Sequence, residues 1–237
     1  MFKRILALAA LTLLTSLANA DEADIKKAVT ALYGGNVKVD AVRKAGALSL
    51  YEVQIGSDIL YADEKGSYFI QGDIIDVKAH VNLTEVRKNK LAQIKFSDLP
   101  LELAVKTVRG NGKRIFATFE DPNCGYCKKF AVEIAGMTDY TMYTFLYPIL
   151  SPNSSEKSKA IWCAADPAKT WNEWMVKGVV PAEGKCAAPI DKLMALGQKL
   201  NVRGTPAIFF ANGERIPGFV PAAKLEQELN RITSIKS

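Results

Sequence analysis

The motif Cys-Gly-Tyr-Cys at residues 124–127 constrains the fold most strongly, because of the segments on its two sides. The apolar run of residues 114–119 predicts a buried β-strand, which residues 120–123 then end. Beyond the motif, apolar residues recur at helical spacing, at Phe130, Ala131 and Ile134. Cys124 is therefore expected at the N-terminus of a helix, where unpaired N–H groups and the helix dipole favour an anion.

A cysteine in this position is stabilised as a thiolate, which is the form that attacks disulfide bonds. We predict that Cys124 and Cys127 are the catalytic pair, with Cys124 as the thiolate that forms a mixed disulfide with a substrate. Either a substrate thiol or Cys127 then displaces Cys124. The alternative is a small structural disulfide between the two cysteines, which the strand–turn–helix context disfavours.

The first 20 residues have the pattern of a secretory signal peptide. Lys3 and Arg4 precede an apolar run at residues 5–17, and residues 18–20 form an Ala-x-Ala cleavage site. A membrane anchor is the alternative, but the run is shorter than the roughly 20 residues that a spanning helix needs. No later segment is long and apolar enough to cross a membrane. We therefore predict a cleaved signal peptide at residues 1–20 and an exported, soluble mature protein.

Charge and cysteine spacing exclude several kinds of partner. Loss of Lys3 and Arg4 lowers the formal net charge from +6 to +4, without a basic block that would favour nucleic acid. Zinc could use four cysteines, but a zinc ribbon needs a second close pair, whereas Cys163 and Cys186 are 23 positions apart. The only histidine, His80, lies far upstream of every cysteine. We predict no metal and no cofactor.

Residues 21–80 predict a small α+β domain. An amphipathic helix around residues 25–32 stops at two glycines, and strand-like segments follow at residues 48–55, 59–62 and 68–77. A turn at residues 63–66 joins two of these strands in a hairpin. About 60 residues bury little core on their own, so pairing of exposed strand edges with a second copy would stabilise the domain.

A connecting helix and a larger domain follow. Asn82 as N-cap and Glu85 at the third position predict a helix that continues to Lys95, and its polarity favours a linker at residues 81–103. In residues 104–237 the expected strands are 114–119, 141–147 and 207–210, and the expected helices follow Cys127 and cover 157–165, 169–176, 190–200 and 222–232. This order predicts a sheet between layers of helices.

Four segments together resemble a known family. Gly204-Thr205-Pro206 stands where the thioredoxin fold carries its cis-proline loop. The mature chain resembles the bacterial periplasmic disulfide isomerases of the DsbC type, with the related DsbG type as second choice. The matching segments are Cys124-Gly125-Tyr126-Cys127, Tyr68-Phe69-Ile70-Gln71-Gly72, Ala160-Ile161-Trp162-Cys163-Ala164 and Gly204-Thr205-Pro206-Ala207. The resemblance implies a mixed α+β and α/β chain, with a cystatin-like dimerisation domain, a linker helix and a thioredoxin-like catalytic domain that carries a helical insertion.

The resemblance also implies an activity and partners. A periplasmic homodimer would hold misfolded secreted proteins, with a chaperone function, and would reduce and isomerise their incorrect disulfides. An inner-membrane electron donor of the DsbD type would keep the dithiol reduced. Gly125 and Tyr126 match the isomerase type, whereas Pro-Tyr is typical of the DsbG type and Pro-His of the oxidant DsbA. Pro206 would be cis, with Thr205 offering its backbone to an extended substrate; the alternative is an ordinary turn.

We interpret Cys163 and Cys186 as a structural disulfide within the helical insertion, a pair that the DsbG type is not expected to have. Two free buried thiols are the alternative, which export disfavours. Closing a loop of this length contributes about 3 kcal/mol in the chain-entropy model.

One position departs from the wider fold family. Thioredoxin and DsbA carry a buried acid six residues before the first cysteine, and Thr118 holds that place here. Glu120 and Asp121 are closer to the motif, and either could assist proton transfer to Cys127. Because most acids in such a loop meet solvent, we expect neither to be catalytic.

Three other functions compete with isomerisation. The first is a DsbG-like reductase that acts on single oxidised cysteines of secreted proteins. The second is a periplasmic holdase whose dimer grips unfolded chains, with redox chemistry secondary. The third is a DsbA-like oxidant, which the Gly-Tyr pair and the additional N-terminal domain disfavour.

Overall fold

The computed structural model describes residues 20–234, with side chains from residue 22 onward. The predicted signal peptide lies outside the described residues, apart from Ala20. Within the described range, no helix combines the length and the apolar character that crossing a bilayer requires. The chain divides into two compact units, residues 1–88 and 89–237. The separate linker expected at residues 81–103 stays a prediction.

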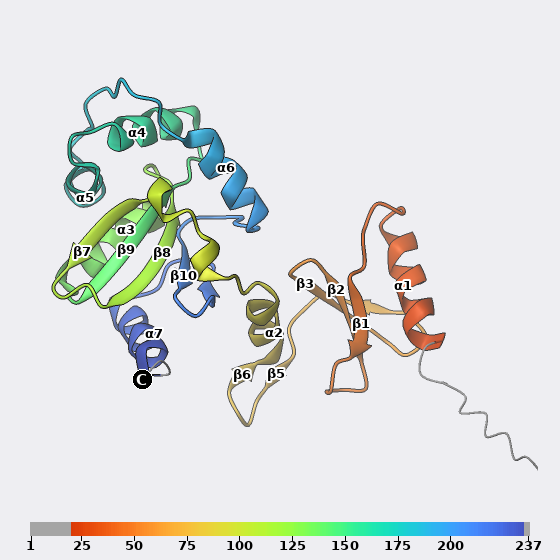
Figure 1. The fold of residues 1–237 in the computed structure, drawn as a ribbon. Helices are drawn as coiled ribbons and strands as arrows, with labels where there is room; N and C mark the ends of the chain where they lie inside the picture. Colours follow the sequence, from red (N-terminus) through yellow and green to blue (C-terminus); the bar gives the residue numbers. More distant parts are fainter. Residues whose placement is uncertain (1–19, 235–237) are drawn as a thin grey trace, which may run out of the picture. The chain divides into compact units, whose positions relative to one another are not determined.

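The first unit is an antiparallel sheet with one helix packed against it (Figure 1). Helix α1 (Ala20–Leu32) contributes Ile25 and Val29 to a buried cluster with Tyr51 and Val53 of the sheet. The sheet has the order β1-β2-β3-β4, and a separate two-stranded sheet follows it. The strands are β1 (Ala41–Lys44), β2 (Tyr51–Ile55), β3 (Asp58–Ala62), β4 (Phe69–Ile70), β5 (Ile75–Asp76) and β6 (Val81–Asn82).

Two expected strands of this unit have the wrong extent. The strand expected from residue 48 begins at Tyr51, because Leu48 and Ser49 have positive φ angles of 57° and 51° and belong to the turn after β1. The segment expected at residues 68–77 is divided between β4 and β5. Strand β1 itself was missed, because it is short and exposes both Arg43 and Lys44.

Helix α2 (Leu83–Leu91) begins where its capping sequence predicts. The side chain of Asn82 accepts a hydrogen bond of 2.9 Å from the backbone N–H of Glu85, which satisfies one of the free donors of the first turn. The helix ends at Leu91 and does not reach Lys95.

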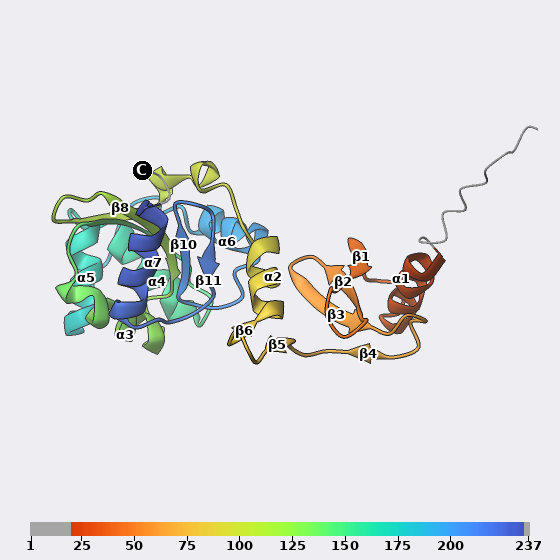
Figure 2. The same cartoon turned by 90° about the horizontal axis from the view of Figure 1, so that it is seen from below.

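The second unit is built on a five-stranded sheet of order β11-β10-β8-β9-β7, seen from two sides in Figures 1 and 2. Strands β8 and β9 are parallel, and the other neighbours are antiparallel. The strands are β7 (Val105–Arg109), β8 (Arg114–Glu120), β9 (Tyr140–Leu146), β10 (Ala207–Phe210) and β11 (Arg215–Ile216). The sequence missed β7, because this edge strand buries only Val105 and therefore lacks an apolar pattern.

Helices cover both faces of this sheet, because alternate residues of β8 point to opposite sides. Phe116 packs with Phe130 of α3 and Leu225 of α7. Phe119 belongs to the opposite cluster, together with Ile161 of α4. The helices are α3 (Gly125–Glu133), α4 (Pro152–Trp162), α5 (Pro167–Lys177), α6 (Ile190–Lys199) and α7 (Ala222–Ser234), with short 3-10 turns at Phe96–Asp98, Leu101–Leu103 and Ile134–Gly136. Helix α4 starts five residues earlier than expected, because Ser151 caps it and Pro152 occupies its first turn.

Candidate active site

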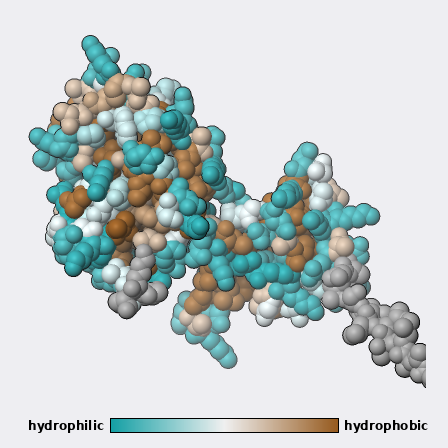
Figure 3. Space-filling view, viewed as in Figure 1, coloured by the Kyte–Doolittle hydropathy of each residue, from teal (hydrophilic) through white to brown (hydrophobic). Residues whose placement is uncertain are grey.

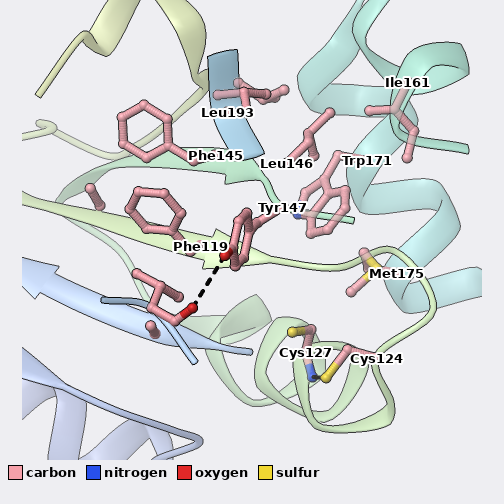
Figure 4. Packing of buried hydrophobic residues seen from close by; sticks show 14 of the residues in the cluster. Phe119, Cys124, Cys127, Phe145, Leu146, Tyr147, Ile161, Trp171, Met175 and Leu193 are labelled. Carbon is pink, nitrogen blue, oxygen red and sulfur yellow. Dashed lines mark hydrogen bonds between the residues drawn. The ribbon is translucent and has the colours of Figure 1, made fainter. Parts of the chain in front are cut away.

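The two cysteines of the motif lie at the first turn of α3, directly after the sheet (Figure 4). Strand β8 ends at Glu120, and Cys124 is the N-cap residue of α3. The backbone N–H of Cys127 donates a hydrogen bond to the sulfur of Cys124 at 3.3 Å. Neither Cys124 nor Cys127 forms a disulfide in this structure. Cys124 thus takes the place at the helix N-terminus where a negative charge is best stabilised.

Hydrogen bonds lower the pKa of Cys124 from 9.0 to about 5. The largest contribution is the hydrogen bond from the Cys127 side chain. Hydrogen bonds with Thr205 and with the backbone of Cys127 and Tyr126 also lower the pKa, while burial opposes them. Cys124 is therefore a thiolate at neutral pH, and 6% of its surface is exposed to solvent.

Cys127 has the opposite character. Its side chain has no exposed surface, and burial raises its pKa far above the ordinary range of a thiol. The hydrogen bond to Cys124 and the charges of Glu120 and Cys124 raise it further. The pair therefore combines one sulfur that is stabilised as a thiolate with one thiol that burial keeps protonated.

The loop before β10 lies against the first cysteine. The Thr205–Pro206 peptide bond is cis, and the carbonyl oxygen of Thr205 lies 3.2 Å from the sulfur of Cys124, where it accepts a hydrogen bond when Cys124 is protonated. These residues are 81 positions apart in sequence. They meet because β10 pairs with β8, with Ala207 opposite Phe119, so the start of β10 adjoins the end of β8.

The two residues between the cysteines are at the surface. Gly125 is exposed, and Tyr126 exposes 65% of its surface. The ring of Tyr126 lies 6.3 Å from the ring of Phe219, measured between centroids, and the ammonium group of Lys129 lies 4.5 Å from the centre of the Phe219 ring. The exposed Tyr126 between the two cysteines therefore lies near a second aromatic ring.

Asp121 holds the loop that precedes Cys124, and it is completely buried. One carboxylate oxygen accepts hydrogen bonds from the Asn123 backbone at 2.7 Å and from the Ser154 hydroxyl at 2.8 Å. The other oxygen accepts a hydrogen bond from the Leu150 backbone at 2.9 Å. From α5, the indole of Trp174 donates to the carbonyl of Pro122 at 2.6 Å. The helices inserted between β9 and β10 thus hold the active-site loop in place through hydrogen bonds.

Glu120 is also buried, with 1% of its surface exposed. The Thr118 hydroxyl donates a hydrogen bond to Oε1 of Glu120 at 2.8 Å, and burial raises the pKa of this carboxyl group to about 8. The expectation that Glu120 and Asp121 meet solvent is therefore wrong. Strand β8 continues through Glu120, and alternate residues of a strand share one face. Thr118 and Glu120 therefore lie on the same covered face as Phe116. The sequence contained this indication of their burial.

The other two cysteines form a disulfide, with an S–S distance of 1.93 Å. Cys163 is the C-cap residue of α4, and Cys186 lies in the segment before α6. The bond thus joins two parts of the inserted helical region.

Comparisons with known proteins agree along the chain. The family model described as "Disulfide bond isomerase protein N-terminal domain" matches residues 16–85, and the one described as "Thioredoxin-like domain" matches residues 101–233. A probable thiol:disulfide interchange protein DsbC of Bordetella pertussis is 51% identical over 191 residues, which cover 81% of this chain and 68% of that protein. The thiol:disulfide interchange protein DsbC of Escherichia coli K12 is 31% identical, covering 90% of this chain and 89% of that protein.

A solved structure is similar to part of the chain. The crystal structure of a disulfide interchange protein from Neisseria gonorrhoeae is 39% identical, with a TM-score of 0.55. The match covers 56% of this chain and 97% of the Neisseria chain.

Proposed function

The chain belongs to the DsbC family of thiol:disulfide interchange proteins and is a disulfide isomerase, and from that premise we propose which residues, partners and compartment serve the reaction. The fold class expected from the sequence, a thioredoxin-like domain preceded by the N-terminal domain of this family, is confirmed. The observation that supports the assignment of residues best is the opposite perturbation of the two cysteines, a low pKa at Cys124 and a high one at Cys127.

In the proposed reaction, the Cys124 thiolate attacks one sulfur of a substrate disulfide. A bond forms between Cys124 and that sulfur, and the second substrate sulfur leaves as a thiolate. Isomerisation follows when a substrate thiolate attacks the mixed disulfide and Cys124 leaves. Reduction follows when Cys127 loses its proton and attacks Cys124, which closes the Cys124–Cys127 disulfide and releases the substrate thiolate.

Two neighbouring segments are proposed to bind the substrate beside Cys124. Thr205 and Pro206 border Cys124, and an extended substrate segment would pair with the backbone there like an added strand. The exposed Tyr126 would contact apolar parts of a misfolded chain, since its ring is not covered. Gly125 beside it leaves the approach to the sulfur open, because it has no side chain.

A homodimer is proposed to form through the first unit. Figure 3 shows hydrophobic surface around α2, β5 and β6. Apolar side chains of these elements are exposed, Ile75 by 59%, Val77 by 77% and Val86 by 57%. At β4, Tyr68 is exposed by 76% and Ile70 by 51%. A unit of this size buries a limited core. Strand β4 lies at an edge of its sheet, and an edge strand can pair with a second copy, which would also cover the apolar surface.

The proposed compartment is the periplasm, with misfolded secreted proteins as substrates and an inner-membrane donor of the DsbD type as the source of electrons. The signal-peptide pattern of residues 1–20 supports export. The disulfide between Cys163 and Cys186 supports an oxidising environment, because such bonds persist mainly outside the cytosol.

Refolding of a scrambled multi-disulfide protein tests the assignment. We expect the mature protein to restore activity to the substrate, the Cys124→Ala variant to have no effect, and the Cys127→Ala variant to accumulate mixed disulfides. Reduction of sulfenic acids without refolding would support the DsbG-like reductase instead. Full protection of a substrate by a Cys124→Ala, Cys127→Ala double variant would support the holdase. A largely oxidised Cys124–Cys127 pair in vivo would support the oxidant.

A further inference from the structure

A buried carboxyl group ends the strand that leads to the dithiol, and its burial has no structural explanation. Glu120 is 1% exposed, and its Oε2 atom has no hydrogen-bond partner among residues 20–234. Its other oxygen is held only by the Thr118 hydroxyl, which also lies 3.3 Å from the Thr144 hydroxyl. Burying a carboxyl group with an unsatisfied oxygen destabilises a protein. Such a group therefore suggests a role in the reaction.

The reaction itself leaves one proton without an acceptor. Cys127 must lose its proton before it can attack the mixed disulfide, yet its side chain has no exposed surface. Bulk water therefore cannot reach the thiol directly. Glu120 is adjacent in the chain to Asp121, whose backbone forms a hydrogen bond with Cys127, and the charge of Glu120 acts on Cys127.

We propose that Glu120 is the internal proton acceptor for Cys127 in the step that releases substrate from the mixed disulfide. The inference rests on the proposed function of the two cysteines. The S–H bond of Cys127 breaks and its proton goes to the Glu120 carboxylate. The Cys127 sulfur then bonds to Cys124, the bond from Cys124 to the substrate breaks, and the substrate leaves as a thiolate. Glu120 later returns the proton to solvent or to that thiolate.

The charge of Cys124 sets the timing of this transfer. Burial is the main cause of the raised pKa of Glu120, and the charge of the Cys124 thiolate raises it further, so the carboxyl group keeps a proton. In the mixed disulfide Cys124 carries no charge, and this cause of the raised pKa is lost. The carboxyl group of Glu120 therefore loses its proton more readily in the mixed disulfide, which is the state in which Cys127 has to be deprotonated.

Within residues 20–234, no cation is among the groups that shift the pKa of Glu120. Those that interact with Glu120 are Cys124 and Cys127 at the start of α3, Thr118 on the same strand, and Tyr140 on β9. The adjacent Asp121 is occupied by three hydrogen bonds from Asn123, Ser154 and Leu150.

Single-turnover kinetics of the reduced mature protein with a fluorescence-quenched disulfide peptide test the inference. The Cys127→Ala variant isolates the attack by Cys124, because it cannot release the peptide. We expect Glu120→Gln to leave the attack rate within about 2-fold and to slow release by about 100-fold, the lower end of what a positioned proton acceptor contributes. The release rate of the unmodified protein should rise with pH and level off, whereas that of Glu120→Gln should lack this titration.

Two further variants keep the test decisive. Thr118→Val removes the hydrogen bond that lowers the pKa of Glu120, so the midpoint of the release profile should move to higher pH. Glu102→Gln, at an exposed glutamate of the same unit, should behave as the unmodified protein. An unchanged release rate and pH profile in Glu120→Gln would overturn the inference. If Glu120→Gln does not fold, an unchanged midpoint of the release profile in Thr118→Val would overturn it. Absence of any attack by the unmodified protein would instead defeat the proposed function.

Discussion

At the scale of single residues, two sulfur atoms of the same type differ because their surroundings differ. Cys124 receives hydrogen bonds at a helix N-terminus, which stabilise its anion. Cys127, three positions later, is one helical turn further into the protein, where burial stabilises the neutral thiol. The proposed roles of Cys124 as nucleophile and Cys127 as resolving thiol therefore follow from their positions along the first turn.

This difference predicts the pH dependence of alkylation. Because the pKa of Cys124 is lowered to about 5, its reaction with iodoacetamide should increase with pH up to a plateau, with a midpoint near pH 5. Cys127 should stay unmodified across the same range. Mass spectrometry of the labelled peptides measures both. A midpoint near pH 8 to 9, as for an ordinary thiol, would contradict the predicted thiolate.

Glu120 predicts a pH-dependent stability. Its pKa is raised from 4.5 to about 8 in the folded state, so its contribution to stability is complete below about pH 4.5 and is lost as the pH rises through 8. The Glu120→Gln variant lacks this loss. The difference in unfolding free energy between this variant and the unmodified protein should therefore shift in favour of the variant from pH 5 to pH 9, by on the order of a few kcal/mol. Urea unfolding at both pH values measures the difference, and Glu102→Gln is the matched control.

At the scale of elements, the helices inserted between β9 and β10 support the active-site loop. Trp174 of α5 bonds to the loop backbone, and its ring lies 4.2 Å from the ammonium groups of both Lys128 and Lys157, measured to the ring centroid. Lys157 of α4 also donates a hydrogen bond of 2.7 Å to Asn123. The loop that positions Cys124 is therefore shaped by contacts with α4 and α5.

Replacement of Trp174 tests this support. Trp174→Phe keeps an aromatic ring but leaves the Pro122 carbonyl without its donor, so we expect a loss of about 2 kcal/mol. The looser loop should weaken the hydrogen bonds to Cys124 and raise its pKa, which the alkylation profile reports. Trp171→Phe, at a buried tryptophan of the same helix, should cost packing energy but leave that pKa unchanged. Equal profiles for both variants would contradict the proposed support.

The disulfide in the same region predicts a separate effect. The Cys163→Ser, Cys186→Ser double variant should lose about 3 kcal/mol of stability, because a loop closed over 23 positions becomes free in the unfolded chain. The alkylation midpoint of Cys124 should not move. Urea unfolding without reductant measures the loss. A shifted midpoint would show that the bond also supports the active site.

At the scale of the whole molecule, the proposed dimer concerns the surface of the first unit. Val77 is 77% exposed, so Val77→Asp should not unfold the unit but should prevent another copy from covering the apolar surface. Light scattering should then report a monomer. Isomerisation of scrambled substrates should fall, while attack on a small disulfide peptide continues. Leu48→Asp, 75% exposed in the turn after β1, is the control that should remain dimeric. A monomeric unmodified protein would refute the dimer.

The amino-acid sequence by itself determined the local parts of this protein: the strand and helix around residues 124–127, the Asn82 cap and most helix positions. These depend on side-chain periodicity and on hydrogen bonds between near neighbours. Only the tertiary structure decided that Thr205 lies beside Cys124. This contact depends on β10 pairing with β8, and contacts between distant segments leave no periodic trace in the sequence.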